Sequence, residues 1–311
     1  MDAQDFHLET LTDAVRYFAD QEKCQRFVEQ MRWPEGIECP YCKSKNIGRI
    51  TSRHAYQCRQ CREQFSVKVG TIFEDSPLSL DKWLVAIWVV VNCKNGISSC
   101  EVARHIGVTQ KTAWYMDHRI RTAMQGPDGG KLSGEVEVDE TFIGGKARFM
   151  HKSRRGAKIK STGHSGKVVV MGLLERHGKV KIEVVRNTRR NSLRPLVVEH
   201  VEAGAKVYTD ALPSYETLDK EFEHQVIDHA EAYVKGNVHT NGMENYWSLL
   251  KRTIKGTYVS VEPFHLFRYL DEQAFRFNRR KATDGERFTD AMRSISGKRL
   301  TYQKLTGDCL S

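Results

Sequence analysis

Four of the eight cysteines follow a spacing that limits what the first part of the chain can fold into. Cys39 and Cys42 form one C-x2-C pair, Cys58 and Cys61 form another, and fifteen residues separate the pairs. This spacing predicts a zinc site with four thiolate ligands. In a zinc ribbon the metal supplies folding free energy that so small a core lacks. The alternative is a redox motif or two unrelated C-x2-C pairs.

The compartment that we expect for this chain supports the interpretation of the cysteines as metal ligands. The longest apolar stretch, residues 83–91, is about half of the ~20 residues that a membrane-spanning helix needs. The acidic N-terminus has no apolar core of a signal peptide. We therefore expect no membrane partner and a cytoplasmic location, where cysteines serve as metal ligands or free thiols before disulfides.

The charge balance points to a nucleic-acid partner. Lys and Arg total 49 against 39 Asp and Glu, which gives a formal net charge of +10. Hydrophobic residues make up 40% of the chain, enough for a real core, so a fully disordered chain is excluded. A basic excess of this size favours binding to DNA or RNA over an enzyme that handles small molecules.

A helix-turn-helix is expected after the cysteine segment. Helical patterns cover 100–106 and 110–124, and a short turn that contains Gly107 separates them. The second helix carries Lys111, His118, Arg119 and Arg121. From these, Lys111 and Arg119 are our candidates for DNA contact. The alternative is a helical hairpin that only fills a core.

Before a linker at 127–130, further helices are expected at 10–31 and 80–91.

After this linker, in the second half of the chain, strands and helices are mixed. Beyond it, the patterns predict strands at 134–143, 168–174, 179–185, 206–210 and 223–228, and helices at 193–201, 241–255 and 263–276. This order favours a mixed α/β sheet with helices packed on it.

Three carboxylates stand out by their positions. Asp139 lies on the polar side of the first of these strands, Asp210 closes a later strand, and Glu244 lies on the polar face of the 241–255 helix. Carboxylates are preferred ligands of Mg²⁺, and two such ions can drive an in-line displacement at phosphorus. On the same helix face, Lys251 lies two turns after Glu244, where it can hold a DNA phosphate.

Spacing alone does not single out this set. Glu140 and Asp228 are alternatives, and Glu135 and Glu137 share the face of Asp139. Trp247 belongs to the apolar face of the 241–255 helix, so we interpret it as a core residue.

A basic stretch follows the first strand. Between Glu140 and Glu175 there is no acidic residue, while the basic ones are Lys146, Arg148, Lys152, Arg154, Arg155, Lys158, Lys160 and Lys167. A solvated loop is one interpretation, but eight uncompensated cations repel one another. DNA phosphates would relieve that repulsion, so we expect DNA contact here, with Arg154 and Arg155 as candidates.

Four stretches carry a resemblance to a known family. They are EVDETFIGG at 137–145, YTD at 208–210, HTNGMENYWSLLKR at 239–252 and YLDEQAFRFNRR at 269–280. The chain resembles the transposases of bacterial insertion sequences that join an N-terminal zinc ribbon to a DDE domain, the ISXO-two-like group. The resemblance runs from the ribbon to about Arg280.

The resemblance implies an α/β, ribonuclease-H-like catalytic domain. Asp139, Asp210 and Glu244 would bind two catalytic Mg²⁺ or Mn²⁺ ions, with Asn241 or Asn245 as a variant that replaces or assists Glu244. Lys251 would be the basic residue that follows the glutamate in many DDE enzymes, and we also expect Arg252 and Lys255 of the same helix to contact DNA. The expected segments are an N-terminal helical part at 1–35, the zinc ribbon at 36–70, the helix-turn-helix at 76–126, the catalytic domain at 132–282 and a tail without a clear role at 283–311.

The implied function is transposition of an insertion sequence. The protein would bind the terminal inverted repeats, hydrolyse the phosphodiester at the element ends, and join the exposed 3′ hydroxyl to target DNA. Self-association on DNA and association with the nucleoid are expected with this function. The alternatives are a DNA-binding regulator derived from an inactive transposase, and a nuclease of the same fold that does not join strands.

Overall fold

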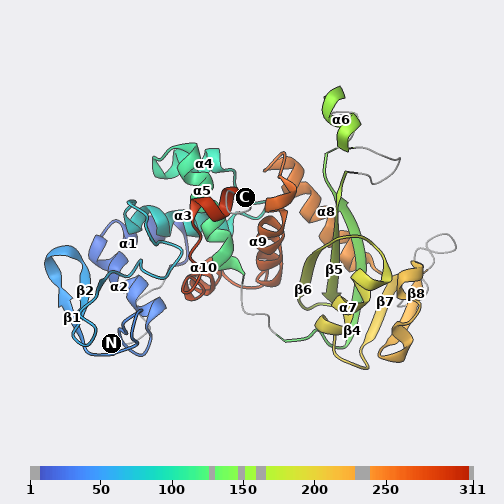
Figure 1. Cartoon of the computed structure of the whole chain (residues 1–311), viewed down its shortest axis with the longest axis horizontal. Coiled ribbons are helices and arrows are strands. Elements are labelled where there is room, and N and C mark those ends of the chain that lie inside the picture. Colours follow the sequence, from blue (N-terminus) through green and yellow to red (C-terminus); the bar gives the residue numbers. More distant parts are fainter. Residues whose placement is uncertain (1–7, 126–129, 146–150, 159–165, 228–238, 308–311) are drawn as a thin grey trace. The chain divides into compact units, whose positions relative to one another are not determined.

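The computed structural model describes residues 8–125, 130–145, 151–158, 166–227 and 239–307, and the chain divides into two compact units (Figure 1). Unit 1 combines Met1–Gly126 with Arg279–Ser311, whereas unit 2 is the continuous stretch Pro127–Asn278. In the described part of the chain, no helix has the length and apolar character needed to cross a membrane.

The cysteine segment of unit 1 forms a small antiparallel sheet with the order β1-β2-β3. Its strands are β1 (Ile47–Ile50), β2 (Ala55–Cys58) and β3 (Gln64–Phe65). Two helices precede the sheet, α1 (Leu11–Phe18) and α2 (Gln21–Arg32). The single helical pattern expected at 10–31 is therefore interrupted, because the Asp20 side chain caps the start of α2.

Three helices follow the small sheet, close to the ranges expected from the sequence. They are α3 (Leu80–Asn92), α4 (Ser99–Ile106) and α5 (Gln110–Met124). Ser98 and Glu101 form a capping box at the start of α4, and Gly107 ends this helix with a φ of 63°. The turn between α4 and α5 is therefore defined by local sequence.

The last part of the chain returns to unit 1. It forms α10 (Asp284–Arg293) and α11 (Tyr302–Thr306). Phe288 of α10 is buried, and its ring stacks on Phe27 at 5.5 Å and lies 5.2 Å from Trp88 and 5.8 Å from Phe18. Residues 283–311, expected as a tail without a role, thus contribute to the core of unit 1.

Unit 2 contains a five-stranded sheet with the order β6-β5-β4-β7-β8. The strands are β4 (Glu135–Ile143), β5 (Val168–Glu175), β6 (Val180–Val185), β7 (Lys206–Asp210) and β8 (Glu223–Ile227). β4, β5 and β6 pair antiparallel, whereas β7 pairs parallel to both β4 and β8. β4 is thus the central strand, and α6 (Lys152–Lys158) lies between it and β5 in the chain.

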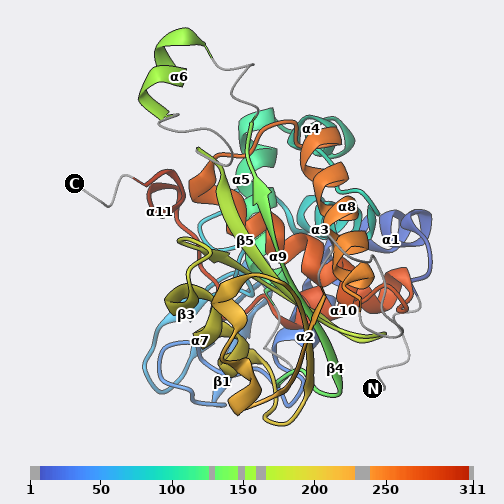
Figure 2. The same ribbon diagram turned by 90° about the vertical axis from the view of Figure 1, so that its right-hand side faces the viewer.

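Helices cover both faces of this sheet (Figure 2). On one face, α7 (Arg190–His200) packs on a core that includes Val136, Val138 and Val207. On the other face, α8 (Asn241–Gly256) and α9 (Leu266–Asn278) enclose a second core. Short 3-10 helices complete the chain at Thr51–Arg53, Pro213–Tyr215, Leu218–Lys220 and Pro263–His265. The mixed α/β sheet expected from the sequence is present.

A glycine allows α8 to lie close to the sheet. A Cβ atom on Gly172 of β5 would lie 2.2 Å from Met243 Cε and 2.8 Å from the Trp247 ring. Both neighbours belong to α8, so a larger side chain at this position would force the Met243 and Trp247 side chains to move.

We expect Gly172→Ala to lower the free energy of unfolding by about 1–3 kcal/mol, the usual cost of overpacking a core. Urea denaturation of the full chain measures this change. Gly256→Ala is the matched control, because a Cβ on this helical glycine meets nothing within 4 Å. Equal stability of Gly172→Ala and the wild type would show that α8 is not held closely against β5.

Candidate functional site

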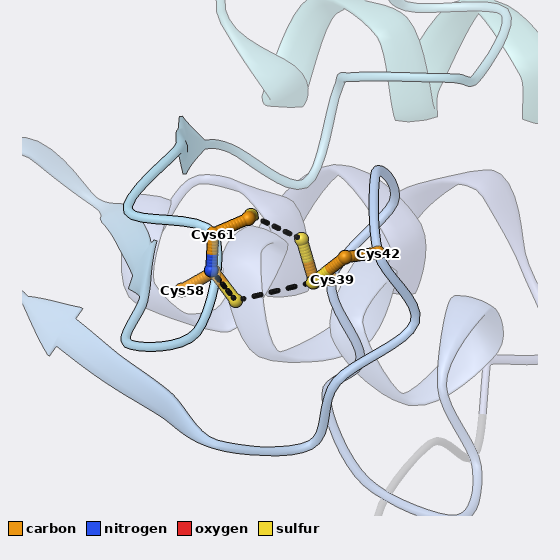
Figure 3. A group of neighbouring side chains, drawn as sticks. All are labelled: Cys39, Cys42, Cys58 and Cys61. Atoms are coloured by element: carbon orange, nitrogen blue, oxygen red, sulfur yellow. Dashed lines mark hydrogen bonds between the residues drawn. The ribbon is translucent and has the colours of Figure 1, made fainter.

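The four cysteines predicted to bind zinc converge in unit 1 (Figure 3). The Cys39 and Cys61 sulfurs are 3.6 Å apart, and those of Cys42 and Cys58 are 3.5 Å apart. Backbone N–H groups of Cys61 and Gln60 lower the pKa of the Cys58 thiol to about 6, whereas burial and the neighbouring sulfurs raise the pKa of the Cys42 and Cys61 thiols. A closed set of four sulfur donors fits a structural Zn²⁺ ion.

A second group of possible ligands lies in unit 2. Oxygen atoms of Asp139, Glu140 and Asp210 all lie within 4.8 Å of one another. The parallel register of β4 and β7, which pairs Glu137 with Tyr208, brings Asp139 in the middle of β4 beside Asp210 at the end of β7. Glu140, one of the alternatives left open by the sequence, belongs to this group, and its carboxylate accepts a hydrogen bond from the Tyr215 hydroxyl.

The electrostatics of this group favour a bound cation. Burial raises the pKa of Asp139 to about 6, with further contributions from the negative charges of Asp210 and Glu244. Burial, followed by the charges of Asp210 and Asp139, raises the pKa of Glu140 to about 8. Three half-buried carboxylates repel one another, and an oxygen-preferring divalent cation would offset this cost. The donor set therefore fits Mg²⁺ or Mn²⁺.

Glu244 is not one of the three carboxylates of this group, but its charge affects the pKa of Asp139. It occupies the first turn of α8, on the exposed face that it shares with Asn241 and Asn245. Its negative charge contributes to the raised pKa of Asp139, which places it near the acidic group. The opposite face of α8 is buried as predicted, through Met243, Tyr246, Trp247, Leu250 and Ile254.

Three basic residues follow Glu244 on α8. Arg252 and Lys255 are exposed, and Lys251 is half-buried. Burial and the positive charge of Lys255 lower the pKa of Lys251, while the negative charge of Asp139 opposes this change. Lys251 is therefore close enough to the acidic group to interact with it electrostatically.

The sequence interpretation missed a role of Trp247. This residue is buried as expected, but its indole Nε1–H also donates a hydrogen bond to Asp139 Oδ2 over 2.9 Å. The apolar periodicity of α8 explains the burial and contains no signal for the hydrogen bond. The sequence offers one hint of this hydrogen bond: the N–H of a buried tryptophan usually finds a hydrogen-bond acceptor.

Trp247→Phe is expected to reduce metal-dependent activity by about tenfold, because outer-shell partners orient the carboxylates that hold a metal. The free energy of unfolding should fall by about 1–3 kcal/mol, since a carboxylate oxygen loses its donor. Activity and urea denaturation are measured on the same protein. Trp33→Phe is a suitable control, because Trp33 packs on Tyr56 and Phe65 in unit 1. Unchanged activity would contradict the orienting role.

One predicted DNA contact is wrong. Arg119 is only 4% exposed, and its guanidinium donates to the backbone carbonyls of Leu300, Ile72 and Glu74. It is therefore unavailable to a phosphate. His118 and Arg121 on the same helix are also buried. The reason is that residues of the C-terminal segment pack on α5, a return of the chain that helical periodicity does not reveal.

Other basic candidates remain accessible. Lys111 is exposed at the start of α5, and Lys152 and Arg155 are exposed on α6. The side chains of Arg154 and Lys158 lie outside the described part of the chain, as do Lys146, Arg148, Lys160 and the alternative ligand Asp228.

Comparisons with known proteins match the two segments of the chain that contain these residues. The family model described as ISXO2-like transposase domain matches residues 131–278, and that described as transposase zinc-ribbon domain matches residues 19–64. An uncharacterized protein in transposable element ISH50 of Halobacterium salinarum is 27% identical over 251 residues, which cover 76% of this chain and 84% of that protein. An uncharacterized transposase-like protein of Haemophilus influenzae is 35% identical over 101 residues, or 32% of this chain and 81% of its own length.

Among solved structures, the simian T-cell lymphotropic virus intasome in complex with PP2A regulatory subunit B56 gamma covers 56% of this chain and 63% of its own. Its TM-score of 0.28 and sequence identity of 13% are too low to support an argument. The family assignment depends instead on the two sequence domains, which contain the cysteine cluster and the acidic group. The chain therefore belongs to the insertion-sequence transposases that combine a transposase zinc ribbon with an ISXO2-like transposase domain.

Proposed function

We propose that this protein cleaves the ends of an insertion sequence by metal-dependent hydrolysis and joins the exposed 3′ hydroxyl to target DNA. The observation that carries the proposal is the convergence of Asp139, Glu140 and Asp210 beside α8, inside a transposase domain. The order of the sheet, with β4 central, antiparallel strands on one side and parallel strands on the other, supports a ribonuclease-H-like fold.

Each residue has a distinct part in this proposal. Asp139 and Asp210 would hold the metal, and Glu244 would complete the set from the first turn of α8. Two divalent ions bound there would activate the attacking oxygen and stabilise the leaving one. Lys251, with Arg252 and Lys255 further along α8, would bind the DNA backbone next to the scissile phosphate.

The remaining elements would bind DNA. The zinc ribbon and the α4–α5 pair, acting as a helix-turn-helix, would recognise the terminal inverted repeats, with Lys111 as one contact. Lys152 and Arg155 on α6 add positive charge that favours a polyanion. Two element ends must meet before joining, so the proposal includes self-association on DNA.

A strand-transfer assay tests the proposal. It uses purified zinc-loaded protein, a pre-cleaved oligonucleotide of the element end and supercoiled plasmid, in magnesium or in EDTA. Magnesium-dependent joining supports a transposase. Cutting of an uncleaved end without joining favours a nuclease of the same fold, and binding of the end without either reaction favours a DNA-binding regulator.

The same assay separates the two candidates for the third carboxylate. If Glu244 completes the metal set, Glu244→Gln abolishes joining, and Glu140→Gln reduces it less. If Glu140 has this role, the order of the two losses is reversed. Both variants keep side-chain size, so a difference between them reports the lost charge.

A further inference from the structure

A buried carboxylate that the proposed reaction does not use lies under the start of α8. Glu137 of β4 is 1% exposed, and its side chain faces the helix. Its Oε2 accepts a hydrogen bond from the backbone N–H of Met243 over 2.9 Å. Met243 directly precedes Glu244, so this bond fixes the turn from which Glu244 extends.

Arg176 holds the Glu137 carboxylate in place. Its Nε donates to Glu137 Oε1 over 3.0 Å, and its Nη1 donates to Glu135 Oε2 over 3.0 Å. Its Nη2 donates to the carbonyl oxygen of His239 over 2.8 Å, just before α8 begins. The guanidinium also lies over the Tyr208 ring, 4.2 Å from its centroid. One arginine therefore links β4 to the chain that enters α8.

The approach of the helix to this carboxylate is close. A Cβ atom on Gly242 would lie 2.7 Å from Glu137 Oε2 and 2.7 Å from Leu174 Cδ2. Only a glycine at this position lets the N-terminus of α8 reach the carboxylate. The negative charge also lies at the positive end of the helix dipole, which strengthens the contact.

We infer that Glu137 is a positioning residue, which fixes the first turn of α8 and thereby sets Glu244 relative to Asp139 and Asp210. This inference rests on the proposed function, because it gives Glu244 a place in the metal site. The competing explanation is that the Glu137–Arg176 pair only supports the fold. In that case apolar side chains could replace the pair without loss of stability or of metal affinity, as they often can for buried ion pairs. The two explanations differ in what happens to metal affinity when stability is preserved.

Two double variants separate these explanations. Glu137→Met with Arg176→Met replaces the ion pair by apolar chains and removes the acceptor for the Met243 N–H. Glu137→Gln with Arg176→Met also removes both charges but keeps an amide oxygen that can accept this bond. The two proteins therefore differ at one hydrogen bond to α8, and neither contains an unpaired buried charge at these two positions.

Terbium luminescence is the readout, because Tb³⁺ takes oxygen ligands and is excited by a nearby tryptophan. Trp247 Nε1 lies 2.9 Å from Asp139 Oδ2, so an ion at the acidic group is next to its indole. Loss of the signal in Asp139→Asn assigns it to this site. The midpoint of a Tb³⁺ titration is measured together with the unfolding midpoint for each full-length protein.

We expect Glu137→Met with Arg176→Met to bind Tb³⁺ about tenfold more weakly than Glu137→Gln with Arg176→Met, at similar stability. Equal Tb³⁺ midpoints in the two double variants would overturn the inference alone. A wild-type protein without the Tb³⁺ signal would overturn the proposed metal site, and the inference with it.

Glu272→Gln is the control for an indirect effect of lost stability. The buried Glu272–Arg276 pair lies on α9, where Glu272 accepts a hydrogen bond from Tyr258 beyond the C-terminal end of α8. This variant should lower stability and leave the Tb³⁺ midpoint unchanged. A weakened midpoint in Glu272→Gln would mean that any loss of stability weakens the metal site, which would contradict a specific positioning role of Glu137.

Discussion

Replacement of Asp139 or Asp210 by asparagine is expected to abolish metal-dependent cleavage and joining. Each carboxylate belongs to the close acidic group of unit 2, and an amide lacks the negative charge that holds a divalent cation. The loss should exceed the roughly 10–100-fold effects that are typical of outer-shell partners. Rates are measured on a labelled element end in magnesium, with cleavage and joining followed separately.

Binding of the terminal repeats is the internal control for these two variants. Because the cysteine cluster and the α4–α5 pair belong to unit 1, the affinity for the element end should stay near the wild-type value. Neither variant should unfold the protein, since removal of one of three mutually repelling carboxylates relieves repulsion. Joining by Asp139→Asn at the wild-type rate would show that the reaction takes place elsewhere.

Removal of zinc is expected to unfold the cysteine segment of unit 1. The sheet β1-β2-β3 is small, and one strand has only two residues, so hydrophobic burial gives it little stability of its own. Structural zinc contributes about 10–16 kcal/mol in small zinc modules, which is comparable to the whole stability of a typical domain, about 5–15 kcal/mol. Cys58→Ser should therefore lose bound zinc, protection of amides in this segment from hydrogen exchange, and binding of the element end.

Cys100→Ser is the matched control, because Cys100 is exposed and has no place in the cluster. Its zinc content should remain one ion per chain. Amides of the unit 2 sheet should stay protected in both proteins, since unit 2 has its own two cores. Persistent protection of β1 and β2 in metal-free Cys58→Ser would mean that the ribbon does not depend on zinc.

Local sequence patterns correctly predicted those features that depend only on the helix, strand or loop to which a residue belongs. The cysteine spacing placed the four ligands together, and helical periodicity correctly assigned the buried face of α8. The alternation along 134–143 predicted β4 and put Asp139 on its polar face. The choice of Asp139 over the other acidic residues of this strand came from the family resemblance and not from its position.

The sequence failed where a role depends on distant parts of the chain. Arg119 has the helix position and charge of a DNA contact, but the carbonyl of Leu300, 181 residues later, accepts from its guanidinium. Trp247 fits an apolar stripe, and only the packing of α8 on β4 brings its indole to Asp139. Glu140 points away from Asp139 in an ideal strand, yet its carboxylate joins the same group beside the end of β7.

The order of synthesis follows from the way unit 1 is assembled. Its two stretches flank unit 2 in the chain, so a ribosome completes the whole sheet domain before it adds Phe288. Until then, Phe18, Phe27 and Trp88 lack the ring that packs among them in the finished protein. A chain that ends before α10 therefore lacks one of the four aromatic rings of this core, so we expect its unit 1 to be less stable than that of the full chain.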